Sequence, residues 1–113
     1  MDLPMGLAVA NPSVVLDGVS PGLLGFLAQM GIVHKTVFGK DLVITSGKDG
    51  THVPGSMHYT GHAVDLRTVD KDPAGVDLLL HMLAYAVVGE RIAFFDERNK
   101  PGGAHIHLEW LGA

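Results

Sequence analysis

Two segments of the chain place apolar residues on one face of a helix. Each begins with a capping residue followed by proline, Asp72-Pro73 and Ser20-Pro21, which is a typical helix start. The segment after Asp72 predicts a helix over about residues 73–88, with an apolar stripe of Val76, Leu79, Leu80, Leu83 and Val87. The segment after Ser20 predicts a shorter helix of about 10 residues, because Gly31 supplies a stop signal.

Short apolar or alternating runs predict the strands. Gly39-Lys40-Asp41 separates two such runs and predicts a hairpin turn between them. The predicted strands are His34–Phe38, Leu42–Thr45, Ala63–Thr68, Arg91–Phe95 and Ala104–Trp110. This order predicts an α+β domain, with an antiparallel sheet and about two main helices on one of its faces.

The remaining segments are rich in turn-forming residues. Residues 1–19 predict an irregular lead-in, and residues 96–103 predict a polar turn region that includes Pro101-Gly102-Gly103. Residues 46–62 form a long segment of Gly, Ser, Thr, His and Pro without a helical period. Irregular segments of this length in a compact domain are usually functional or disordered.

Composition narrows the class of protein. A chain of 113 residues predicts one domain over residues 1–113. The absence of cysteine excludes disulfides, thiolate metal sites and a cysteine nucleophile. Twelve acidic residues against eight scattered Lys and Arg argue against a nucleic-acid partner. The apolar stretches are too short for membrane insertion, and residues 1–4 lack the features of a secretion signal, so we expect synthesis in the cytoplasm.

Histidines and an aspartate alternate with apolar residues on two predicted strands. His105, His107 and Glu109 would share one face of the last strand, opposite the apolar Ile106, Leu108 and Trp110. Asp65 would take the same face if residues 63–68 form the neighbouring strand. His58 can fold back over this face because Gly61 allows a tight bend.

Two imidazoles and one carboxylate are a ligand set that suits Zn²⁺, with the fourth position left for water. His58, Asp65 and His107 are the candidate ligands, and His105 or Glu109 could handle protons beside them. A solvated strand face that binds no metal remains the alternative. His52 could line the same cleft, whereas His34 is expected in a loop or at a sheet edge.

The segment Ser56–Leu66 resembles the Ser-x-His-x-x-Gly-x-Ala-x-Asp-Leu signature of the M15-type zinc D-alanyl-D-alanine peptidases, which belong with the hedgehog-like metallopeptidases. His105-Ile106-His107 resembles the His-x-His of the same group, and Val43–Gly47 resembles the strand that leads into the active-site loop. The resemblance runs from about Leu42 to Trp110, in the right order.

The resemblance implies zinc on His58, Asp65 and His107, with His105 as the catalytic histidine and Ser56 near the substrate. The family often has an arginine after the Ser-Gly of the preceding strand, where Lys48 stands here as the nearest substrate-binding candidate. Some members place a glutamate three residues before the last zinc histidine. Ala104 occupies that position, which assigns more of the proton handling to His105.

The expected function is therefore zinc-dependent hydrolysis of an amide bond in peptidoglycan stem peptides, of the D-Ala-D-Ala carboxypeptidase or L-Ala-D-Glu endopeptidase type. The expected setting is a phage-type lysin or a virion-associated domain that acts on the cell wall, with a cytoplasmic dipeptidase as a further possibility. Two alternatives stay open. One is a non-catalytic zinc-binding or virion-assembly module of the same fold, and the other is a hydrolase of another small amide.

Overall fold

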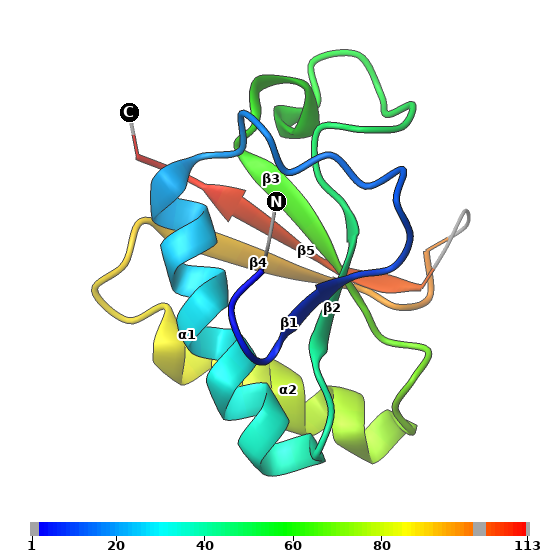
Figure 1. Ribbon diagram of the computed structural model, residues 1–113, viewed down its shortest axis with the longest axis vertical. Helices are drawn as coiled ribbons and strands as arrows, with labels where there is room; N and C mark the ends of the chain where they lie inside the picture. Colours follow the sequence, from blue (N-terminus) through cyan, green and yellow to red (C-terminus); the bar gives the residue numbers. More distant parts are fainter. Residues whose placement is uncertain (1–2, 101–103, 113) are drawn as a thin grey trace.

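A five-stranded sheet and two α-helices make up the fold, which confirms the expected α+β class (Figure 1). The computed structural model describes residues 3–100 and 104–112. The elements are β1 (Leu7–Val9), α1 (Pro21–Phe38), β2 (Leu42–Ser46), the 3₁₀ turn η1 (Met57–Thr60), β3 (Ala63–Arg67), α2 (Pro73–Ala86), β4 (Ile92–Glu97) and β5 (His105–Trp110).

The strand order is β1-β2-β3-β5-β4, so the last strand lies between β3 and β4. β1 pairs with β2 in parallel, and the other neighbouring pairs are antiparallel. The strand carrying Asp65 and the strand carrying the His-x-His are thus neighbours, which is the condition on which the candidate ligand set depends. Their register is direct, with Asp65 opposite His107 and Leu66 opposite Ile106.

Both helices pack against one face of the sheet and leave the other face open (Figure 1). Alternate residues of β3 and β5 supply the covered face, and their side chains are fully buried. These are Val64, Leu66, Ile106 and Leu108, which join Leu23 and Leu27 of α1 and Leu79 and Leu83 of α2 in one apolar core. The intervening residues of the same strands necessarily point to the open face.

The first helix is almost twice as long as expected, and the predicted hairpin of residues 34–45 is wrong. α1 continues through Gly31 to Phe38 and ends at Gly39, whose φ of 73° lies in the left-handed region. Gly31 serves a close approach instead of a stop, because a Cβ there would lie 2.8 Å from the carbonyl oxygen of Gly6. His34 is therefore not a loop or edge residue: it is buried in α1, and its Nδ1 donates to the carbonyl of Lys40 at 2.8 Å.

The expected irregular lead-in contains the edge strand β1. This strand has only three residues, too few for alternation to distinguish it from coil, and it is held by pairing with β2. The long segment 46–62 is irregular as expected, apart from Ser46, which ends β2, and from η1. The predicted turn at Pro101-Gly102-Gly103 lies outside the described residues. In the part of the chain that the structure describes, neither helix is long and apolar enough to cross a bilayer.

Gly61 and Gly39 both have a positive φ but differ in their surroundings, which makes them a matched pair for mutation. A Cβ on Gly61 would overlap the carbonyl of Gly18, whereas nothing lies within 4 Å of a Cβ on Gly39. We expect Gly39→Ala to lower the free energy of unfolding by about 1 kcal/mol through backbone strain alone. Gly61→Ala should lower it by about 1–3 kcal/mol more, because of the added clash. Urea denaturation of both variants measures the difference, and equal losses would contradict the close packing at Gly61.

Candidate metal centre

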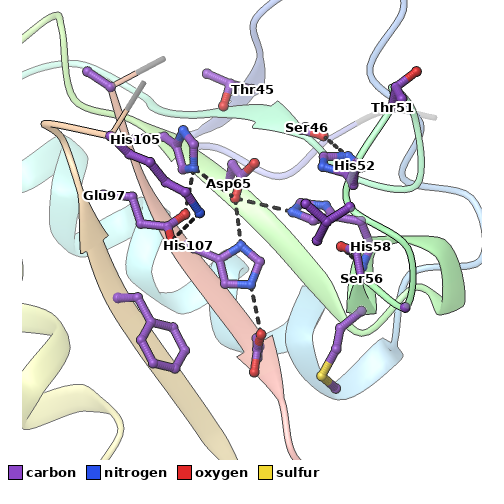
Figure 2. A pocket seen from close by; sticks show the side chains of 17 residues that line it. Thr45, Ser46, Thr51, His52, Ser56, His58, Asp65, Glu97, His105 and His107 are labelled. Carbon is purple, nitrogen blue, oxygen red and sulfur yellow. Dashed lines mark hydrogen bonds and ion pairs between the residues drawn. The ribbon is translucent and has the colours of Figure 1, made fainter. Parts of the chain in front are cut away.

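A cleft of about 1050 Å³ opens on the sheet face that the helices leave uncovered (Figure 2). Its floor is formed by β3, β5 and the end of β4, and one wall is formed by the segment between β2 and η1. Seven of the eight site residues expected from the sequence line it, namely His52, Ser56, His58, Asp65, His105, His107 and Glu109.

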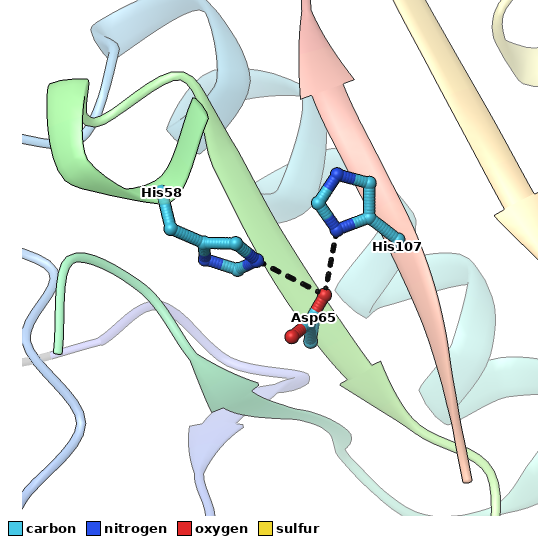
Figure 3. Close-up of side chains that lie close together, drawn as sticks. All are labelled: His58, Asp65 and His107. Carbon is cyan, nitrogen blue, oxygen red and sulfur yellow. Dashed lines mark hydrogen bonds and ion pairs between the residues drawn. The ribbon is translucent and has the colours of Figure 1, made fainter. Parts of the chain in front are cut away.

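The three expected ligands converge on one carboxylate oxygen (Figure 3). Asp65 Oδ1 lies 2.9 Å from His107 Nδ1 and 3.3 Å from His58 Nε2. One ligand atom from each residue lies within 4.8 Å of the other two, which is close enough for all three to hold one metal ion. Asp65 and His58 are almost fully buried, with exposed fractions of 6% and 2%.

Different elements bring the three side chains together. Asp65 and His107 face each other because they are directly paired in the β3–β5 ladder. His58 comes from η1, whose N-cap Ser56 accepts the backbone N–H of His58 through its Oγ at 3.2 Å. Gly61, in the left-handed conformation, then ends η1 and turns the chain into β3. The site residues from 56 to 65 are thus placed by a capped turn followed by a strand.

Each candidate histidine ligand is held through its other ring nitrogen. His58 Nδ1 donates to the carbonyl of Gly47 at 2.8 Å, and His107 Nε2 donates to Glu109 at 3.0 Å. Histidines that bind metals usually donate their second N–H in this way, which fixes the ring orientation and the tautomer. The outer hydrogen bonds of a metal site are therefore built into the fold.

The tautomer of His58 has a further consequence. With its Nδ1 proton given to Gly47, a neutral His58 presents the lone pair of Nε2 to Asp65 Oδ1 at 3.3 Å. Two electron-pair donors that face each other need a cation between them, either a proton or a metal ion. The arrangement of His58 and Asp65 therefore fits a bound cation.

The pKa shifts of Asp65 and His107, which face each other across β3 and β5, also favour a bound cation. The pKa of Asp65 lies well below its ordinary value: burial acts to raise it, but hydrogen bonding with His107 and His58 outweighs burial. The pKa of His107 is raised, since burial acts to lower it and the carboxylates of Asp65 and Glu109 outweigh that effect. A buried carboxylate is thus kept ionised, which is the state that binds a metal.

His52, expected as a cleft residue, stacks directly on the candidate ligand His58. Their ring centroids are 3.9 Å apart and the rings are parallel to within 1°. His52 Nε2 lies 2.9 Å from the carbonyl of Asp49, and the Tyr59 hydroxyl bonds to the backbone N–H and C=O of His52 at 2.7 Å each. These contacts fix the wall of the cleft against His58.

Glu97 is a cleft residue that the sequence pattern did not indicate. It stands eight residues before His105, yet the β4–β5 register places the two directly opposite each other. Its Oε1 accepts from His105 Nε2 at 2.8 Å, and its Oε2 lies 3.1 Å from Lys100 Nζ. Glu97 could have been predicted only from the register of the β4–β5 hairpin. Its distance along the chain from the turn, and not a short motif, brings it to the site.

Lys48 is placed differently from the other expected residues. Its side chain is exposed and lies beside Gly18, not among the residues that line the cleft. The lysine that does line the cleft is Lys100, at the rim next to Glu97. A substrate contact by Lys48 stays a prediction that this geometry does not support.

Comparison with known proteins adds no family to this geometry. No protein-family model matches the chain, and no solved structure matches it.

Asp49 supports the loop that holds His58, and its loss should be measurable. Its Oδ1 accepts the backbone N–H groups of Val15 and Gly47 at 2.8 Å each, and these hydrogen bonds lower its pKa even though partial burial acts to raise it. We expect Asp49→Ala to lower the free energy of unfolding by about 1–3 kcal/mol at pH 7.

Because the pKa of Asp49 is depressed in the folded state, its contribution is present above the unfolded value near 3.8 and is lost as the pH falls through the folded value. The gap between wild type and Asp49→Ala should therefore narrow below about pH 4. Urea denaturation at several pH values measures it, and a gap that is constant down to pH 3 would contradict this role of the ionised carboxylate.

Proposed function

We propose that this protein is a zinc-dependent peptidase that hydrolyses an amide bond in peptidoglycan stem peptides. The observation that carries the proposal is the convergence of His58, Asp65 and His107, which all line an open cleft, with each imidazole hydrogen-bonded to an acceptor through its other ring nitrogen. Two imidazole nitrogens and one carboxylate oxygen are a set that zinc prefers in catalytic sites.

Zinc bound by these three residues would supply Lewis-acid polarisation of the scissile carbonyl and activation of water. The cleft side of the ligand set stays open to solvent and substrate, whereas the sheet and α-helices close the other side. Three protein ligands with one open side distinguish a catalytic zinc site from a structural one, which is closed by four protein ligands.

His105 is the side chain best placed to act on the substrate. It lies on the same strand face as His107, with its Nε2 3.7 Å from Asp65 Oδ1, and it lines the cleft. As an imidazolium it carries two N–H groups, one donated from Nε2 to Glu97 and the other, on Nδ1, available to the oxygen of a substrate carbonyl as negative charge develops there. Phe95 and Met57 give the cleft apolar surface beside these polar groups, where substrate side chains can pack.

The choice of peptidoglycan as substrate rests on the resemblance of Ser56–Leu66 and His105–His107 to the M15-type peptidases. In the folded chain these two segments meet at the cleft, as one site would require. Hydrolysis of another small amide would use the same ligands and differ only in the cleft walls.

The metal ligands are tested by Asp65→Asn, which keeps the shape of the side chain and removes its charge. We expect bound zinc to fall from about one equivalent to below about 0.1, and lysis of purified cell walls to fall by more than about 100-fold. Loss of a residue that only hydrogen-bonds a metal ligand typically costs about 10–100-fold, and loss of the ligand itself should cost more. Asp41→Ala, an exposed carboxylate paired with Lys35, is the control and should change neither. Elemental analysis and wall turbidity, with and without a chelator, give the readouts. Zinc that survives Asp65→Asn, or lysis that resists chelation, would contradict the proposal.

His105→Ala separates catalysis from metal binding. We expect it to keep one equivalent of zinc and to lower the rate of hydrolysis by about 10²–10³-fold, the effect of removing one transition-state hydrogen-bond donor. Turbidity assays beside elemental analysis measure both. A wild-type protein that binds zinc but shows no hydrolysis of cell walls or of D-Ala-D-Ala and L-Ala-D-Glu peptides would instead favour the non-catalytic module of the same fold.

A further inference from the structure

Two histidines of β5 compete for one place beside Asp65. His107 Nδ1 lies 2.9 Å from Asp65 Oδ1, and His105 Nε2 lies 3.7 Å from the same oxygen. Both side chains project from the same face of the strand, so the His-x-His pattern alone does not decide which one binds a metal together with His58. Some other contact must make the two imidazoles different.

The strand register gives each histidine its own carboxylate. His107 of β5 is paired with Asp65 of β3, and His105 of β5 is paired with Glu97 of β4. The contact between His105 Nε2 and Glu97 Oε1, at 2.8 Å, is shorter than its 3.7 Å separation from Asp65. The nitrogen of His105 that faces the metal ligands is therefore the one engaged by Glu97.

From this geometry, and resting on the metal centre proposed above, we infer that Glu97 is a positioning residue that keeps His105 out of the ligand shell. A carboxylate can only accept, so the hydrogen bond places a proton on His105 Nε2. A ring nitrogen that carries a proton has no lone pair for a metal. His105 Nε2 is thereby kept as a donor to Glu97 and not as a metal ligand, and His107, whose Nδ1 faces Asp65, is left as the ligand.

Glu97 is itself fixed in place. Its second oxygen, Oε2, lies 3.1 Å from Lys100 Nζ, so its two oxygens contact two different partners. Asp65, Glu97 and His105 also bring their ligand atoms within 4.8 Å of one another, a second grouping that could hold a cation. The lysine ammonium already offsets the charge of Glu97, which favours the positioning role over a second metal ion.

Without Glu97, the lone pair of His105 Nε2 would be free to bind the metal. We expect zinc-loaded Glu97→Ala to retain one zinc per chain while the number of imidazole ligands rises from two to three. Its kcat should fall by about 10–100-fold, as for other outer-sphere contacts, with a smaller change in KM. Glu97→Gln retains an acceptor oxygen and should keep two imidazoles and most of the activity.

X-ray absorption at the zinc edge counts the imidazoles, and long-range ¹H–¹⁵N NMR of the full chain reports which nitrogen of His105 carries the proton. Asp96→Ala is the matched control, because it removes the neighbouring carboxylate of β4, which binds Arg98 instead. We expect this control to keep two imidazole ligands and the Nε2–H tautomer of His105. Circular dichroism verifies that each variant is folded.

Three imidazoles in the wild type, or two in Glu97→Ala with the His105 tautomer unchanged, would overturn the inference and leave the metal centre intact. Two zinc ions in the wild type and one in Glu97→Ala would overturn it in favour of a second ion at Asp65, Glu97 and His105. A wild type without zinc would overturn the proposed function and, with it, the selection of ligands by Glu97.

Discussion

The pairing of β5 between β3 and β4 determines where the groups of the candidate site lie. An antiparallel ladder fixes which residues stand opposite each other, and here it sets two histidines of β5 against a carboxylate on either side. The side-chain period of a strand is two, so a slip by one residue would send both histidines into the apolar core. The register is held by the same strands' buried residues, Val64, Leu66, Ile106 and Leu108. The core of the protein and the geometry of its site therefore depend on one another.

Burying Asp65 is the main electrostatic cost of this arrangement. A carboxylate removed from water destabilises a protein unless hydrogen bonds or opposite charge compensate. His107 and His58 give that compensation. The pKa of Asp65 is lowered although burial acts to raise it, which means that the interactions with the two histidines outweigh the cost of burial. In a protein without metal, the compensating charge is a proton on an imidazole. A divalent cation can replace that proton, which means that metal binding and protonation of the histidines oppose each other.

The sequence predicts those parts of the fold whose patterns are local. Strict alternation in β5 and β3 predicted both strands and the polar face of each, because a period of two fixes side-chain direction. The meeting of His107 with Asp65 followed only on the condition that the two strands are neighbours, which the strand pairing meets. The length of α1 was not predicted, since Gly31 was interpreted as a stop while its actual role is contact with Gly6. β1 depends on pairing and not on its own three residues. Glu97 reaches the site through hairpin register, which no short motif contains.

The three candidate ligands are not held in place with equal rigidity. Asp65 and His107 project from paired strands in the centre of a sheet, and side chains on such rigid elements are held more accurately than those on loops. His58 comes from a single 3₁₀ turn and depends on contacts made by an irregular segment, the carbonyl of Gly47 and the stacked ring of His52. Order in that segment should therefore govern metal affinity more than the sheet does. Substrate that packs against the same segment would tighten the ligand set, because both interactions favour one loop conformation.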